Sequence, residues 1–258
     1  ILDVSNQNIS DLTGINYFTG LISLNCKNNS LTSLDISQNT ALQNLNCRYN
    51  QISSLDVTKN TSLTNLNCSD NNLSSIDISQ NTALTKFSCE DNQLSAVDVT
   101  NNTFLNYFIC GDNQIINLDV SSNNLLNYFG CHGNQLTSLN ISNNIALEVL
   151  SFGQNLLTTI DVSSNTLLTE FRCYENQLTA LDLSLNTNLN IIDISYNPLN
   201  CLNLKNGNNT SITVFDAVQN PNLNCIQVDN PNWSSANWIN LDAGIAFSIN
   251  CNYPAGCF

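Results

Sequence analysis

Leucine recurs every 21 residues along most of the chain, and the residues around it repeat with the same spacing. The column comprises Leu42, Leu63, Leu84, Leu105, Leu126, Leu147, Leu168 and Leu189. Written from Leu42, one repeat is LQNLNCRYNQISSLDVTKNTS, and the general form is LxxLxCxxNxLxxLDVSxNTx. The form persists from Leu21 to about Leu204, which corresponds to about nine copies. A fixed period of this length indicates a solenoid of stacked repeats.

Each repeat contains two short segments in which apolar and polar residues alternate. In the copy that starts at Leu42, they are residues 45–47 and 55–57, which centre on Asn46 and Asp56. Alternation with a period of two predicts β-strands. Stacked repeats would pair equivalent strands in parallel around one continuous core. We therefore predict a β-rich solenoid of parallel strands.

The two ends of the chain depart from this pattern and are expected to form caps. Residues 1–20 are expected to form an N-terminal cap and a partial first repeat, because the stretch DLTGINYFTG could make one helical turn over the first repeat. The repeat array proper is expected at residues 21–209. Residues 210–258 are expected to form a degenerate last repeat and a C-terminal cap, since this tail carries Trp233, Trp238 and other large apolar residues. Terminal repeats need such lids over the exposed end of the core.

The repeat resembles the leucine-rich repeat, LxxLxLxxNxL, in its short 21-residue bacterial class, sometimes called IRREKO, with cysteine replacing the third leucine in most copies. The resemblance implies an arc whose first strands line the concave face, and noncatalytic recognition of proteins or other macromolecules. The segment before Leu21 is similar to the internalin type of repeat. Repeats of the form LDIS-NT followed by such a tail look most like secreted surface proteins of Bacteroidetes-type bacteria, which implies a secreted or cell-surface location.

The 11 cysteines fall into two groups. The first group occupies one inward position of the repeat: Cys26, Cys47, Cys68, Cys89, Cys110, Cys131 and Cys173. Phe152 and Ile194 stand at the same position, so we interpret this column as an apolar filler of free, buried thiols and not as a zinc site. The second group is Cys201, Cys225, Cys251 and Cys257 in the C-terminal region. We expect disulfides there, with Cys225–Cys251 preferred and Cys201–Cys225 as the rival pair.

Asparagine and aspartate also form columns along the array. The first asparagine column comprises Asn29, Asn50, Asn71, Asn92, Asn113, Asn134, Asn155, Asn176 and Asn197, and the second runs from Asn39 to Asn186. Both are expected to be structural, because a turn asparagine can satisfy neighbouring backbone groups. The aspartate column on the second segment includes Asp35, Asp56, Asp77, Asp98, Asp119, Asp161 and Asp182. We expect no cofactor, with calcium at carboxylate pairs as the alternative.

The outward positions of the first segment vary between repeats, and they supply the candidate binding surface. Its residues are Lys86, Tyr107, Ile109 and Tyr128, with Glu90, Asp91, Asp112 and His132 at the edge. Stacked tyrosines beside polar rims suit a sugar ring or an extended peptide. The alternative is a tyrosine ladder that only stabilises neighbouring strands.

Charge and composition exclude several functions. The formal net charge of −14 disfavours nucleic acid and anionic membranes, and no apolar stretch approaches the roughly 20 residues that span a bilayer. With a single histidine and no GxSxG, HExxH or phosphate-binding glycine loop, we expect no enzyme activity. We therefore predict an extracellular module that binds a protein partner through its strand-lined face. The alternatives are a carbohydrate-binding module with a tyrosine platform, and a passive adhesin or stalk spacer.

Overall fold

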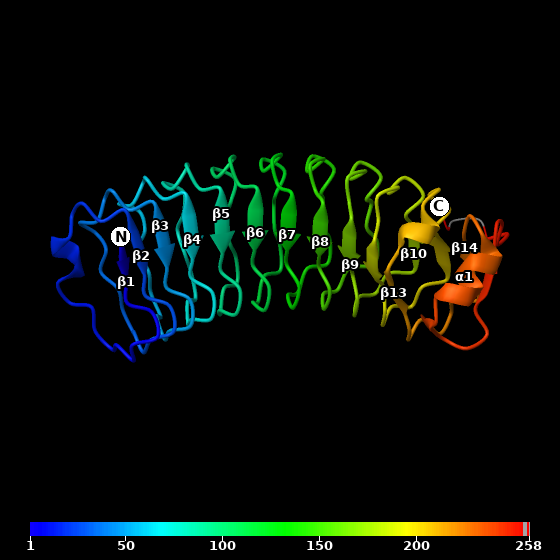
Figure 1. Ribbon diagram of the computed structural model, residues 1–258, viewed down its shortest axis with the longest axis horizontal. Helices are drawn as coiled ribbons and strands as arrows, with labels where there is room; N and C mark the ends of the chain where they lie inside the picture. The colour runs from blue at the N-terminus through cyan, green and yellow to red at the C-terminus, as the bar shows by residue number, and fades with distance from the viewer. Residues whose placement is uncertain (255–256, 258) are drawn as a thin grey trace. The chain divides into compact units, whose positions relative to one another are not determined.

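The chain folds as stacked turns of parallel β-strands. The computed structural model describes residues 1–254 and 257. Its contacts form two compact units, Ile1–Asn134 (unit 1) and Gln135–Phe258 (unit 2). Each unit is a solenoid of short parallel strands (Figure 1), so the predicted fold class is confirmed.

Unit 1 contributes one strand per repeat to a single sheet. In chain order these are β1 (Leu2–Asp3), β2 (Ser23–Asn25), β3 (Asn44–Asn46), β4 (Asn65–Asn67), β5 (Lys86–Ser88), β6 (Tyr107–Ile109) and β7 (Tyr128–Gly130). From β2 onward, the register keeps equivalent positions opposite each other, as in the pairing of Leu45 with Leu66. Figure 1 shows these strands side by side, from blue to green. A 3-10 helix, η1 (Ile15–Tyr17), precedes β2 and buries Ile15.

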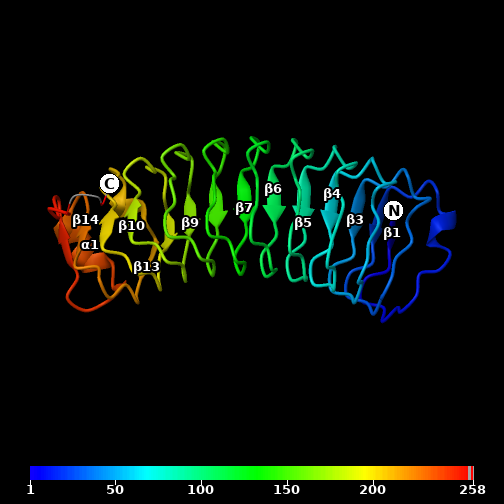
Figure 2. The same cartoon turned by 180° about the vertical axis from the view of Figure 1, so that it is seen from behind.

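Unit 2 carries two sheets. The first contains β8 (Val149–Ser151), β9 (Glu170–Arg172), β11 (Ile191–Asp193), β13 (Val214–Ala217) and β15 (Asn240–Leu241). The second contains β10 (Ala180–Asp182), β12 (Cys201–Asn203), β14 (Cys225–Gln227) and β16 (Ala246–Ser248). Two helices complete the unit, η2 (Asn209–Ser211) and α1 (Pro231–Asn237). The α1 helix lies at the C-terminal end of the unit in both views (Figures 1 and 2).

The inward side chains of unit 1 form a continuous core. Phe87, Phe108 and Phe129 are 0% exposed, and their rings stack with centroids 5.6 and 5.7 Å apart. The cysteine column is buried and, among the described residues, its members form no disulfides, in unit 2 as well as in unit 1. Burial raises the pKa of Cys26 and of Cys68 to about 12, so these thiols stay protonated at neutral pH. The interpretation of this column as core thiols is confirmed.

Both asparagine columns bind the backbone of neighbouring repeats. In the first column, Asn71 Nδ2 donates to the carbonyls of Cys47 and Cys68, both at 3.1 Å, and Asn71 Oδ1 accepts from the Ile52 N–H at 3.0 Å. In the second column, Asn60 Nδ2 donates to the carbonyl of Asn39 at 2.9 Å, while Asn60 Oδ1 has no partner among the described residues. The predicted structural role holds for both columns, but the second column acts as donor only.

The prediction of a second strand in each repeat is wrong for unit 1. The structure describes every residue of this unit. Residues 55–57 keep the predicted alternation, with Val57 buried and Asp56 exposed, but they do not pair as a strand. Asp56 Oδ1 accepts from the Thr58 N–H at 2.9 Å, and Asn81 Nδ2 donates to the Val57 carbonyl at 3.0 Å. The aspartate turn is compatible with pairing, because Asp182 makes the same turn with Ser184 at the end of the paired strand β10. In unit 2 the equivalent segments do pair, from β10 onward.

The aspartate column is satisfied by these local turns. Each carboxylate accepts from the backbone N–H two residues further on, at 2.9–3.0 Å, in Asp35, Asp56, Asp77, Asp98 and Asp119. Hydrogen bonds from that residue lower the pKa of each carboxyl below its usual value of 3.8. Asn140 forms the same turn with Ser142, so the turn geometry does not need the charge.

We expect the melting temperature to fall as the pH drops below about 4. A carboxyl whose pKa is lower in the folded chain stabilises the fold above its unfolded pKa, and that contribution is lost as the pH falls through the folded pKa. Thermal melts followed by circular dichroism across this range measure the loss. A variant with asparagine in place of the five column aspartates of unit 1, from Asp35 to Asp119, should fold, as the asparagine at Asn140 indicates, and should lose less stability in acid. An equally steep loss in this variant would assign the effect to other carboxyls.

Aromatic packing and disulfides close the C-terminal end of unit 2. Trp238 is buried and stacks on Phe215 with ring centroids 4.4 Å apart. Cys225 is bonded to Cys251, as preferred from the sequence, and the rival pairing is wrong because Cys201 is bonded to Cys257. The tail is thereby tied to β12 and β14.

Candidate functional site

Parallel pairing in register arranges the outward side chains of β2–β7 in two rows. One row contains Ser23, Asn44, Asn65, Lys86, Tyr107 and Tyr128, and the other contains Asn25, Asn46, Asn67, Ser88, Ile109 and Gly130. Neighbouring strands lie about 4.8 Å apart. Side chains from successive repeats therefore form a continuous surface, the strand-lined face of unit 1.

An amide-rich trough occupies the N-terminal half of this face. It is a shallow cavity of about 410 Å³, lined by Ser23, Asn25, Asn44, Asn46, Asn65, Asn67, Lys86, Ser88, Tyr107 and neighbouring backbone. Asn65 Nδ2 donates to Asn44 Oδ1 at 2.6 Å, which orients the two amides along the trough. The asparagines of this trough were not among the residues selected from the sequence. In the sequence they could be recognised as asparagines that recur at outward positions of the first strand. The many turn asparagines of each repeat make this pattern hard to distinguish.

Two tyrosines lie at the end of the trough. The rings of Tyr107 and Tyr128 stack with centroids 4.6 Å apart and planes 25° apart, and both residues are half-buried. Desolvation raises the pKa of Tyr107. Because each ring covers one face of the other, the pair does not present a flat two-ring platform side by side. This arrangement is the one expected of a cross-strand ladder.

A charged cluster lies in the turns that follow β3–β7. His132 Nε2 lies 3.3 Å from Glu90 Oε1 and 3.2 Å from Asp112 Oδ2. Arg48 Nε contacts Asp70 Oδ2 at 2.6 Å, and its Nη2 lies 3.8 Å from Glu90 Oε2. The five side chains thus form one connected network of carboxylates with Arg48 and His132. Desolvation raises the pKa of Glu90, and the nearby side chains of His132 and Arg48 oppose the rise.

Two glycines make room for this cluster. A Cβ at Gly111 would lie 2.5–2.8 Å from three atoms of the His132 ring. Gly133 has φ of 61° and lies against Asp112. The equivalent turn position in the three preceding repeats also has positive φ. The residues at that position are Asp70, Asp91 and Asp112. Aspartate tolerates this region better than most residues because its side chain can hydrogen-bond locally.

The structure divides the residues selected from the sequence into two groups. Lys86, Ile109 and the tyrosine pair lie on the strands. Glu90, Asp112 and His132 meet in the following turns. Asp91 lies in the same turns but is exposed, and desolvation and the neighbouring carboxylates of Asp70 and Asp112 raise its pKa.

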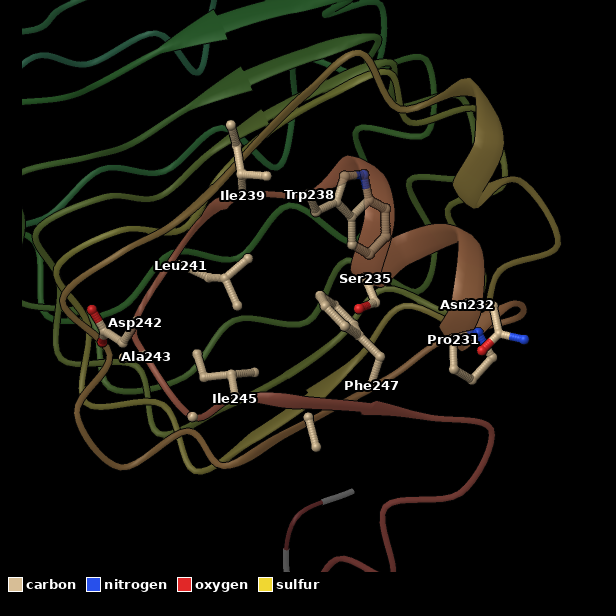
Figure 3. Close-up of a pocket in the computed structure, with 12 residues that line it drawn as sticks. Pro231, Asn232, Ser235, Trp238, Ile239, Leu241, Asp242, Ala243, Ile245 and Phe247 are labelled. Carbon is tan, nitrogen blue, oxygen red and sulfur yellow. The ribbon is translucent and has the colours of Figure 1, made fainter.

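A larger hollow of about 520 Å³ lies in unit 2, beside α1, β15 and β16. Figure 3 shows Leu241, Ile245 and Phe247 pointing toward one another across it. Its charged group, Asp242, accepts from the backbone N–H groups of Gln219 and Asn220 at 2.9 and 2.7 Å. This carboxylate therefore holds the backbone of the preceding turn, and the described residues that line the hollow offer no charged group that is available to a ligand.

Short parallel strands repeated around leucine and asparagine columns define the leucine-rich repeat fold, and the structure has that fold. The functional domain of InlJ from Listeria monocytogenes, described as including a cysteine ladder, superposes with a TM-score of 0.76 and 37% identity, over 88% of this chain and 57% of that one. A leucine-rich repeat protein of Leptospira interrogans superposes with a TM-score of 0.69 and 19% identity, over 93% of this chain and 76% of that one.

Among curated proteins, internalin J of Listeria monocytogenes serotype 4b (strain F2365) is 54% identical over 39 residues, which are 15% of this chain and 4% of that protein. The chain thus spans a small part of this relative, and little more than half of the solved InlJ domain. No family model matches the chain. Within the described residues, no helix has the length and apolar character needed to cross a membrane.

Proposed function

We propose that the chain is a noncatalytic recognition module that binds a protein partner through the strand-lined face of unit 1. The observation that carries this proposal is the amide-rich trough beside the tyrosine pair, which combines hydrogen-bonding groups with aromatic area. Tyrosine is enriched at protein interfaces because it supplies contact area together with a polar group. Stacked repeats generally bind partners over such extended surfaces, and the similarity to the InlJ functional domain supports the same role.

Several features argue against catalysis. The thiols of the cysteine column are buried and protonated, so they lack the thiolate that a nucleophile requires. The single histidine is held between two carboxylates in a turn. Among the described residues, no hydroxyl group is hydrogen-bonded to its ring. Recognition therefore fits these groups better than acid–base or nucleophilic chemistry.

The proposal includes a secreted or cell-surface location and membership of the short 21-residue bacterial class of leucine-rich repeats. Disulfides such as Cys201–Cys257 and Cys225–Cys251 persist in oxidising environments. The core cysteines that are outside disulfides are shielded from oxidation by burial. Similarity to an internalin supports a surface role in bacteria, and the Bacteroidetes-type origin stays a prediction from the repeat pattern.

Carbohydrate binding is the second candidate, and the trough is the observation that favours it. Amide side chains such as Asn44 and Asn65 can donate to and accept from sugar hydroxyls. The stacked tyrosines weaken this candidate, because a sugar ring needs an uncovered aromatic face. The trough therefore suits an extended peptide with polar side chains better than a sugar that requires a two-ring platform.

We expect the double variant Tyr107→Ala/Tyr128→Ala to weaken binding of the partner by roughly 30-fold or more, because buried aromatic anchors at interfaces contribute about 2 kcal/mol or more. The measurement is a binding screen of the chain against arrayed surface proteins and glycans, followed by titration of each hit. The control is Val149→Ala/Glu170→Ala, which changes the same repeat position in unit 2. Binding that is unchanged in the tyrosine variant would place the site elsewhere. Binding to a glycan would favour the second candidate. No binding to any arrayed protein or glycan would favour a passive stalk.

A further inference from the structure

The histidine of the charged cluster faces two carboxylates with a single nitrogen atom. His132 Nε2 lies 3.3 Å from Glu90 Oε1 and 3.2 Å from Asp112 Oδ2, and the three atoms all lie within 4.8 Å of one another. An imidazole nitrogen carries at most one hydrogen, so it cannot donate a full hydrogen bond to both oxygens. A single cation placed between the three atoms would satisfy all of them together.

The distances between the donor atoms match those around a small divalent metal ion. Zinc binds histidine nitrogen and carboxylate oxygen at about 2.0–2.2 Å, so donors at neighbouring corners of a tetrahedron lie about 3.4 Å apart. The two nitrogen–oxygen separations of the cluster, 3.3 and 3.2 Å, are close to this value. We propose that Glu90, Asp112 and His132 form a binding site for a divalent transition-metal ion of the zinc class.

The surroundings of the cluster favour this site in two ways. Arg48 Nη2 lies near Glu90 Oε2, at 3.8 Å, so the guanidinium orients that carboxylate with its other oxygen toward His132. Oriented ligands of this kind are typical of metal sites. In addition, four carboxylates, those of Asp70, Glu90, Asp91 and Asp112, lie near a single guanidinium, that of Arg48, and a divalent cation would offset the excess of negative charge.

Gly111 provides the space that the imidazole ring of His132 occupies. The residue occupies the repeat position between Glu90 and His132, and any Cβ there would overlap the imidazole ring. The absence of a side chain lets His132 reach back across one repeat to Glu90. Gly153 stands at the same repeat position in unit 2, but there the ring that covers the glycine belongs to Tyr174, which offers no nitrogen donor.

The donor set selects among metals. Nitrogen and two carboxylate oxygens suit zinc, cobalt or nickel, whereas calcium takes six to eight oxygen ligands. Three protein ligands leave a coordination position for water or for an external group, as in open zinc sites. Binding of the metal ion needs no partner, so this inference can be tested separately from the proposed function.

The test titrates the intact, chelator-treated chain with ZnCl₂ in a calorimeter and with CoCl₂ by visible absorption. We expect one ion per chain, His132 as a ligand by its imidazole NMR shift, and an affinity reduced at least 10-fold by His132→Gln. Gly111→Ala keeps all three ligands but displaces the ring, and it should reduce the affinity by about 10–100-fold, as expected when ligand orientation is lost. Gly153→Ala is the matched control and should bind as the unmodified chain does.

Three results would overturn the proposal. The first is no zinc or cobalt binding by the unmodified chain, whose fold is checked by circular dichroism. The second is binding that survives His132→Gln, which would assign the ion to thiols or to carboxylates alone. The third is equal affinity for CaCl₂ and ZnCl₂, because a site with an imidazole ligand should prefer zinc.

Discussion

Replacing Phe108 by alanine is expected to lower the free energy of unfolding by about 3–5 kcal/mol, as is usual when a buried phenyl group is deleted. The ring is 0% exposed and stacks between Phe87 and Phe129, at centroid separations of 5.6 and 5.7 Å. Its removal therefore leaves a cavity that touches two repeat interfaces at once. In a solenoid each repeat is stabilised mainly by its neighbours, so both interfaces weaken. Urea unfolding followed by circular dichroism measures the change.

The matched control for this substitution is Phe104→Ala in the same repeat. Phe104 is 58% exposed, and exposed substitutions usually change stability by less than about 0.5 kcal/mol. A loss below about 1 kcal/mol for Phe108→Ala would contradict the stacked core, because it would mean that neighbouring side chains refill the space. A loss of similar size in both variants would also contradict it, since burial would then not determine the effect.

The repeat period alone predicts most of the fold. Leucine every 21 residues determines which strands pair and in which register, as the match of Leu45 with Leu66 confirms. The second strand of each repeat could not be predicted in the same way. Its alternation records which side chains face inward, but not whether the backbone of residues 55–57 pairs with a neighbour. The aspartate turn does not decide it either, because Asp182 makes the same turn as Asp56 and its segment pairs as β10.

The candidate site was only partly predictable. The outward positions of the first strand were correctly selected as a surface, and the sequence placed His132 and Glu90 at its edge. Their direct contact was not predictable, because the two residues are two repeats apart and meet only where Gly111 lacks a side chain. The tyrosines were selected as a platform, but stacking between adjacent strands depends on ring orientation, which a sequence does not specify.

The change Asn71→Leu is expected to cost roughly 3 kcal/mol of unfolding free energy, because it leaves a buried backbone donor without a partner. The Ile52 N–H donates to Asn71 Oδ1 at 3.0 Å. The carbonyl groups that accept from Asn71 Nδ2 each keep a second donor, as Cys47 does with Asn50 Nδ2 at 3.0 Å. The orphaned group is therefore the Ile52 amide. Leucine has a similar size, so the cost comes from hydrogen bonding and not from lost volume.

Two measurements separate this hydrogen bond from general destabilisation. Urea unfolding gives the total cost, and amide hydrogen exchange should show selectively faster exchange at Ile52, which loses its acceptor. The matched control is Asn72→Leu, one residue further along, where the asparagine is exposed and the expected change is below about 0.5 kcal/mol. Unchanged exchange at Ile52 in Asn71→Leu would contradict the prediction. It would mean that water or another carbonyl replaces the asparagine, and that the column contributes little to the stacking of repeats.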